Sequence, residues 1–189
     1  MLSKQEKIIL KLLGELNGES NPEEIAKMRQ LAAESMQQGA FGISTGLIYA
    51  PSCFADTDEL IEITNGVQPY GGIYASHIRD ERDKMVDAVN EAISIGREAG
   101  VSVEISHHKA CGSSNWGLVK KTLEIIQAAR DEGIDVNADQ YPYTASATSL
   151  SALLPHWAHD GGNKALLERV KHQRATLLDY LNQSSSSGE

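Results

Sequence analysis

The stretches Tyr74-Ala-Ser-His-Ile-Arg-Asp-Glu81 and Glu104-Ile-Ser-His-His-Lys109 decide how this sequence is expected to fold. Each begins as a short apolar run and reaches a Ser-His pair, a pattern typical of a buried β-strand whose end emerges from a sheet. The leading histidines, His77 and His107, lie 30 residues apart, with a helix-like stretch between them. A strand-end histidine repeated one βα unit later predicts a barrel that brings metal ligands together at one edge.

Similar units continue on both sides of these two stretches. Strand-like runs begin near Phe41, Gly72, Val101 and Ile134, and amphipathic helix patterns separate them. Their spacing is close to the roughly 31 residues per unit of an eight-unit barrel. Strands that alternate with helices indicate a parallel sheet with right-handed crossovers. The predicted fold class is therefore α/β, a partial (β/α)8 TIM-type barrel of about four parallel βα units with a C-terminal helical segment.

The chain divides into four expected regions. An N-terminal helix covers residues 1–20, the partial barrel 21–148, a helical segment 149–182 and a disordered tail 183–189. A doubly wound sheet would fit the same period. However, Gly71-Gly72 precedes a strand instead of following one, so the sequence lacks the glycine-rich phosphate loop of a nucleotide-binding fold.

Composition narrows the class of protein. With 189 residues, 41% of them hydrophobic, the chain can bury one sizeable core. A net charge of −9 argues against a nucleic-acid partner. No apolar run is long enough to span a bilayer, and the N-terminus does not read as a signal peptide, so no membrane partner is expected. Cys53 and Cys111 lack CxxC spacing, which favours reduced thiols and a cytoplasmic location.

His77 and His107 are the candidate metal ligands. Neutral imidazole is a good zinc ligand, and a catalytic zinc site uses three protein ligands and a water. The alternative for either histidine alone is a hydrogen-bonded core residue. This alternative loses support because His77 and His107 both follow a serine at matching strand ends. His108 is expected on the opposite side of its strand end, either behind the site or exposed.

Arg79, Lys109 and Tyr141 are the candidate substrate-binding residues. Arg79 and Lys109 each lie two residues past a histidine, so period-two alternation would point them the same way as that histidine. A cation beside a metal suits a substrate carboxylate, although ion pairs with Asp80, Glu81 or Glu104 are equally compatible with the sequence. The Tyr141 phenol could donate to a carbonyl or carboxylate, or simply pack in a turn.

Several motifs together resemble the N-acyl-D-amino-acid deacylase (D-aminoacylase) family of the amidohydrolase superfamily. The resemblance covers roughly residues 21–170 and rests on the following runs: Gly39-Ala-Phe-Gly-Ile-Ser-Thr-Gly46, Tyr49-Ala-Pro51, Tyr74–Glu81, Ile105-Ser-His-His-Lys109, Asn115-Trp-Gly117 and Ala138-Asp-Gln-Tyr-Pro-Tyr-Thr-Ala-Ser146.

The resemblance implies a zinc-dependent hydrolase that cleaves the amide of N-acyl-D-amino acids to a carboxylate and a D-amino acid. It implies that His77 and His107 bind zinc, and that Arg79, Lys109 and Tyr141 hold the carboxylate of a small-molecule substrate and polarise its carbonyl. The family also uses a His-x-His pair, a cysteine ligand and a strand-end aspartate as general acid/base, and this sequence has no counterpart of them. We therefore assign no certain catalytic residue.

The sequence thus corresponds to the middle of such a barrel. We expect the isolated chain to be inactive and to form a homo-oligomer through its exposed half-barrel edges. Two alternatives stay open. One is a non-catalytic, oligomerising remnant of an amidohydrolase barrel. The other is a related amidohydrolase with a dipeptide or cyclic-amide substrate.

Overall fold

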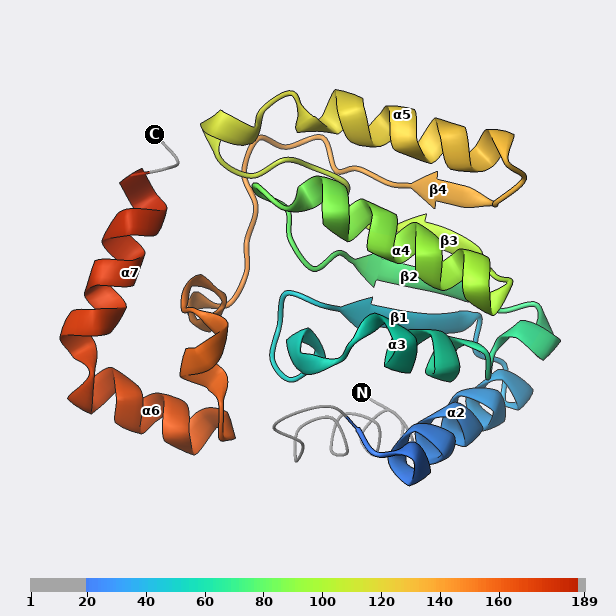
Figure 1. Ribbon diagram of the computed structural model, residues 1–189, viewed down its shortest axis with the longest axis horizontal. Helices are drawn as coiled ribbons and strands as arrows, with labels where there is room; N and C mark the ends of the chain where they lie inside the picture. Colours follow the sequence, from blue (N-terminus) through green and yellow to red (C-terminus); the bar gives the residue numbers. More distant parts are fainter. Residues whose placement is uncertain (1–19, 187–189) are drawn as a thin grey trace.

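The computed structural model describes residues 20–186, and four parallel strands form its centre (Figure 1). The strands are β1 (Gly42–Gly46), β2 (Ile73–His77), β3 (Ser102–Ile105) and β4 (Val136–Ala138). They pair in the order β1-β2-β3-β4, so each strand lies beside its neighbour in sequence. The predicted parallel α/β sheet is therefore confirmed, with each strand within a few residues of its expected position.

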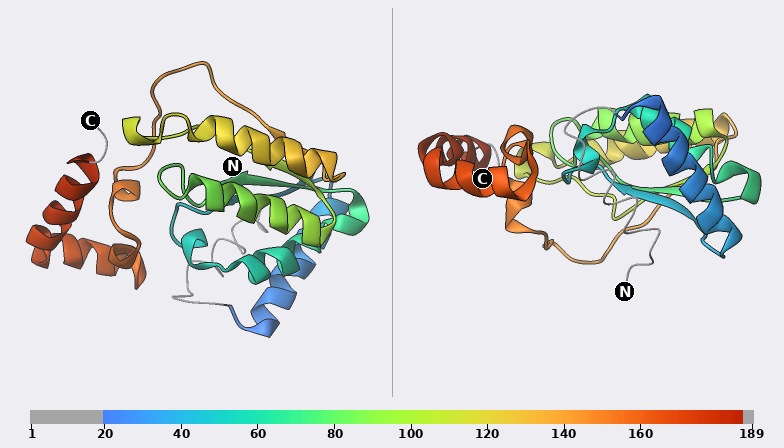
Figure 2. Two further views of the ribbon diagram at one scale, coloured as in Figure 1. Left: turned by 45° about the horizontal axis from the view of Figure 1, so that its top comes forward. Right: turned by 90° about the horizontal axis from the view of Figure 1, so that it is seen from below.

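The helices that connect the strands cover one face of this sheet. They are α3 (Thr57–Thr64), α4 (Met85–Ala99) and α5 (Leu118–Asp131), and α2 (Pro22–Gln37) packs beside α3. Figure 2 shows these helices on the same side of the strands. A doubly wound sheet would carry helices on both faces. Sequential strand order with helices on one face is the arrangement of adjacent units in a (β/α)8 barrel.

Local sequence signals set the helix ends. Asn21 begins α2 with a capping box: its side chain accepts hydrogen bonds from the backbone of Glu23 and Glu24, and the Glu24 carboxylate accepts one from the Asn21 N–H. Pro22 occupies the first helical position, where its missing N–H costs nothing. Gly100 ends α4 in a left-handed conformation (φ 66°), which glycine adopts without steric penalty.

The hydrophobic core lies between the sheet and the helix layer. The strand side chains that face the helices are almost fully buried: Tyr74, Val103, Ile105 and Val136 are each at most 1% exposed. Gly96 lets α4 approach β3 closely, because a Cβ at this position would lie 2.0 Å from a Val103 methyl group. On the other face, which no helix of residues 20–186 covers, Ser44 and Asn137 are exposed and Ile73 is 39% exposed.

A second helical unit lies beyond the carboxyl ends of the strands (Figure 1). It contains α6 (Gly162–His172) and α7 (Arg174–Ser186), preceded by the 3-10 turns Leu150–Leu153 and His156–His159. Three further 3-10 turns lie in the barrel loops, at Ser52–Phe54, Gln68–Tyr70 and Ser113–Asn115. Ala158, Leu166 and Leu177 form a small core separate from that of the sheet. That residues 149–182 are an insert into the barrel stays a prediction.

The ends of the chain differ partly from expectation. The tail expected from residue 183 is wrong for residues 183–186, because α7 continues to Ser186. Serine costs only a fraction of a kcal/mol per helical position, below about 0.7, so it can extend an existing helix. The helix expected over residues 1–20 and the last three tail residues lie outside the described part of the chain, apart from Ser20. Within residues 20–186, no helix has the length and hydrophobicity needed to span a membrane.

Candidate metal centre

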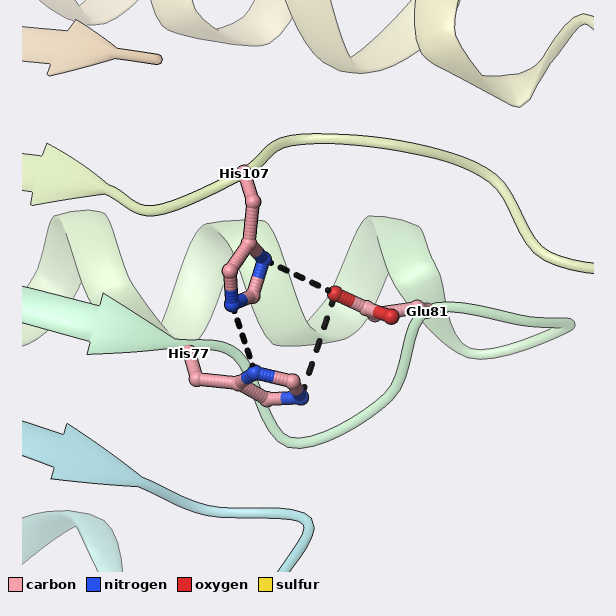
Figure 3. Close-up of side chains that lie close together, drawn as sticks. All are labelled: His77, Glu81 and His107. Carbon is pink, nitrogen blue, oxygen red and sulfur yellow. Dashed lines mark hydrogen bonds and ion pairs between the residues drawn. The ribbon is translucent and has the colours of Figure 1, made fainter. Parts of the chain in front are cut away.

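His77 and His107 meet at the carboxyl edge of the sheet, as the sequence predicts. His77 is the last residue of β2, and His107 lies two residues beyond the end of β3. Their rings are in contact, with His77 Nδ1 and His107 Nε2 2.7 Å apart (Figure 3). His107 has φ 42° and is the only non-glycine residue with positive φ in the described part of the chain. Such backbone conformations concentrate at functional sites.

Glu81 is the third member of this cluster. Its side chain is 8% exposed, and its Oε1 lies 3.3 Å from His107 Nδ1 and 3.9 Å from His77 Nε2 (Figure 3). The sequence offered Glu81 only as an ion-pair partner for the nearby cations and did not select it as a metal ligand. In the structure α4 begins only at Met85, so Glu81 lies in the loop after β2. A carboxylate four residues after a strand-end histidine was the available signal.

Lys109 also lies in the cluster. Its Nζ donates to Glu81 Oε1 at 2.5 Å and to the His107 carbonyl at 3.0 Å, and it lies 3.0 Å from His107 Nδ1. The ion pair with Glu81 is one of the alternatives that the sequence left open. The ammonium also lies 5.3 Å from the centre of the Tyr141 ring, within range of a cation–π interaction.

Tyr141 completes one wall of the site. Its ring centre lies 6.3 Å from that of His107. Its hydroxyl is buried and has no hydrogen-bond partner among residues 20–186. A buried phenol without a partner costs free energy unless a ligand or water satisfies it. The substrate role predicted for Tyr141 is therefore compatible with its position, and it stays a prediction.

Arg79 does not point toward the histidines, and the expected alternation is wrong here. The strand ends at His77, so the period-two rule no longer applies two residues later. The guanidinium instead makes a bidentate pair with Glu91 on α4, with distances of 2.9 Å from Nε and 2.8 Å from Nη2. It also donates to the carbonyls of Cys53 and Ala55, each at 2.9 Å. A substrate role for Arg79 stays a prediction, and it would require these contacts to open.

His108 faces the helix layer and is buried, not exposed. Its Nε2 lies 2.8 Å from the Thr122 hydroxyl of α5. Burial, followed by the nearby Lys109 charge, lowers the pKa of His108. His108 therefore supports the strand end from behind and stays outside the cluster, one of the two positions that the sequence allowed.

The electrostatics of the cluster favour a neutral His77. Burial is the largest cause that lowers the pKa of His77; the Glu81 carboxylate opposes it, while His107 and Lys109 reinforce it. Neutral imidazole is the form that binds metal ions. His77 Nε2 is buried and lacks a hydrogen-bond partner in the described residues, so one ring nitrogen is available.

These groups match the donor set of a zinc site. One nitrogen from each histidine and one oxygen of Glu81 lie within 4.8 Å of one another. Two histidines and a glutamate form a known ligand set for catalytic zinc. The unpartnered His77 nitrogen is the observation that carries this fit, because a buried ring nitrogen is normally satisfied.

Known proteins with similar sequences include a D-aminoacylase and an N-acyl-D-aspartate deacylase. No family model matches the chain. The chain is 47% identical over 139 residues to a D-aminoacylase of Alcaligenes xylosoxydans xylosoxydans, a match of 74% of this chain and 28% of that protein. It is 44% identical over 129 residues to an N-acyl-D-aspartate deacylase of the same organism, covering 67% of this chain and 26% of the relative.

Solved structures give the same neighbours. A D-aminoacylase structure described for its binuclear metal centre has a TM-score of 0.73 and 40% identity, over 82% of this chain and 33% of that one. An N-acyl-D-glutamate deacylase from Bordetella bronchiseptica, in complex with zinc and a phosphonate inhibitor, has a TM-score of 0.66 and 35% identity, over 67% and 27%. The chain spans less than a third of the length of the curated relatives it matches. In sequence and in fold, the chain is thus a relative of the D-aminoacylase family of amidohydrolases, matching one segment of those proteins.

Proposed function

We propose that this chain carries part of the zinc site of a hydrolase that cleaves the amide bond of N-acyl-D-amino acids, giving a carboxylate and a D-amino acid. The observation that carries the proposal is the cluster of His77, His107 and Glu81 at the carboxyl edge of the sheet. It lies in a chain that is 40–47% identical to proteins named as D-aminoacylase or N-acyl-D-amino-acid deacylases.

In this proposal His77 and His107 hold the zinc through their ring nitrogens. When bound, zinc supplies Lewis-acid chemistry and lowers the pKa of a water. Lys109 binds the substrate carboxylate as a point charge, and the unpartnered Tyr141 hydroxyl donates to a substrate oxygen. Arg79 acts on the substrate only if its pair with Glu91 opens. Its present contacts favour a structural role.

We further propose that the isolated chain turns over little substrate. Two histidines and one carboxylate can hold a metal, but no aspartate has been assigned as general acid/base.

The free thiols of Cys53 and Cys111 support a reducing, cytoplasmic setting.

A second candidate function is that of an oligomerising protein without catalysis. The observation that favours it is the open face and edge of the sheet, where Ile73 and Phe41 are 39% and 89% exposed. Parallel strand edges and uncovered apolar side chains promote association between copies. We propose a homo-oligomer that covers this surface. Light scattering at a protein concentration of roughly tens of micromolar, where weak association is detectable, tests this proposal. A protein that is only monomeric at that concentration would contradict it.

Zinc content after chelation and reconstitution tests the first proposal. We expect stoichiometric zinc that is lost in His77→Ala and retained in His172→Ala. His172 is a matched control because its side chain is 73% exposed and lies on α6. N-acetyl-D-methionine and its L enantiomer test turnover by the same preparation. Failure of the reconstituted chain to hold zinc would overturn the metal site.

A further inference from the structure

Lys109 and the proposed metal compete for one oxygen atom. Glu81 Oε1 accepts a hydrogen bond from Lys109 Nζ at 2.5 Å, and the same oxygen faces both histidine rings. Lys109 Nζ also lies 3.0 Å from His107 Nδ1. An ammonium therefore occupies the side of the carboxylate from which a metal ion would bind. Two cations on one carboxylate oxygen repel each other strongly in a partly buried site.

Glu81 and Lys109 are anchored in different ways. The Cys111 N–H donates to the Glu81 carbonyl at 2.7 Å, and the Cys111 thiol donates to the other carboxylate oxygen, Oε2, at 3.6 Å. The first contact fixes the Glu81 backbone from the loop after β3, and the second is a long contact to its carboxylate. Lysine, in contrast, carries its charge on a flexible four-carbon stem. A metal at Glu81 Oε1 would therefore displace the flexible lysine side chain and leave the Glu81 backbone in place.

We infer that Glu81 is the third protein ligand of the metal and that metal binding exchanges the Lys109 ammonium for the metal ion. This inference rests on the proposed zinc site of His77 and His107. The ammonium already lies 5.3 Å from the centre of the Tyr141 ring, and once released from Glu81 it can receive an anionic group of a ligand there. Without metal, Lys109 is held by Glu81. With metal, it is free for the substrate carboxylate, so metal loading precedes productive substrate binding.

Calorimetric titration of the full chain with zinc chloride tests the exchange. We expect Glu81→Gln to weaken zinc binding at least tenfold, because an amide is a poorer ligand than a carboxylate. We expect Lys109→Met to tighten binding by about tenfold, because it removes the competing cation. Asp83→Asn is the matched control, since it removes the same charge from an exposed residue two positions along the loop. Its affinity is expected to stay within about twofold of the parent, as for a solvent-screened charge.

The double variant Glu81→Gln/Lys109→Met distinguishes exchange from long-range charge. If the two residues share the oxygen, Lys109→Met loses its effect once Glu81 is replaced. An equal tightening in both backgrounds would mean that the lysine acts through space, and it would overturn the exchange. Should Glu81→Gln fail to fold, Lys109→Met alone keeps the inference falsifiable, because unchanged or weaker zinc binding would contradict it.

The same titration separates this inference from the proposed function. If His77→Ala leaves zinc affinity unchanged, the zinc site itself is wrong. If His77→Ala abolishes binding while Glu81→Gln has no effect, the zinc site stands and only the role given to Glu81 fails. Circular dichroism of each variant checks that the fold is retained.

Discussion

The contacts of Arg79 make a quantitative prediction about stability. Its guanidinium joins the loop after β2 to Glu91 on α4 and to two carbonyls, those of Cys53 and Ala55. The Arg79 and Glu91 side chains are 27% and 14% exposed, so the pair is largely shielded from solvent. Removing one partner of a buried pair costs about 3–5 kcal/mol, because the other charge stays buried without compensation.

For Arg79→Met we expect the low end of that range. Thr57 still donates a hydrogen bond to Glu91 Oε1 at 2.9 Å, and part of the arginine already reaches solvent. A loss of about 3 kcal/mol corresponds to a fall of roughly 6–12 °C in Tm for a chain of this size. Thermal melts and urea denaturation measure both quantities.

A matched control and a double variant make this prediction sharp. Arg29 pairs with Glu62 at 3.3 Å, but both side chains are about half exposed, so Arg29→Met should change stability by less than about 1 kcal/mol. Adding Glu91→Gln to Arg79→Met should recover part of the loss, because the uncompensated charge is then gone. An Arg79→Met protein as stable as Arg29→Met would refute this reasoning and return Arg79 to the substrate-binding residues.

Three smaller perturbations test the fold around the site. Tyr74→Phe should lower the free energy of unfolding by about 1 kcal/mol in urea denaturation, the cost of one lost hydrogen bond. The cost stays small because the neighbouring hydroxyls of Thr45 and Ser76 remain 3.3 Å apart and can still pair with each other. Gly96→Ala should destabilise the protein despite a helix-propensity gain of about 1 kcal/mol, because the new methyl group overlaps Val103. The double variant Gly96→Ala/Val103→Ala should lose less stability than the two single variants lose in total. Ser102→Ala should raise the pKa of Asp135, which is lowered mainly by the Ser102 hydroxyl, as an NMR titration would show. The folded pKa of Asp135 is the lower one, so its carboxylate stabilises the fold above the unfolded pKa, and this stabilisation is lost as pH falls through the folded pKa. Ser102→Ala should therefore lose less stability than the parent protein when the pH is lowered. An equal loss of stability in acid would contradict this prediction.

The sheet could be predicted because its information is local and periodic. Apolar runs about 31 residues apart, with helical patterns between them, determine both the parallel pairing and the meeting of His77 with His107. The capping signals of α2 and the glycine that ends α4 are equally local. Each of these features depends on a few neighbouring residues.

The rest of the site depends on irregular backbone, where alternation rules stop. Arg79 follows the last residue of β2, and His107 adopts a left-handed conformation that breaks the extended pattern after β3. The position of Glu81 depends on a backbone hydrogen bond from Cys111, 30 residues away. No periodicity encodes such a contact, so the sequence could offer Glu81 as an ion-pair partner but could not select it as a ligand.

The sequential strand order has a consequence for how the chain gains and loses structure. Each βα unit packs chiefly against the next one, so the barrel segment behaves as a short one-dimensional array, much like a repeat protein. Partial unfolding can then begin at either outer strand without disturbing the middle pair. Amide exchange should be slowest in β2 and β3 and faster toward β1 and β4. His77 ends β2 and His107 follows shortly after β3, so both histidines adjoin the middle pair, which is expected to open last.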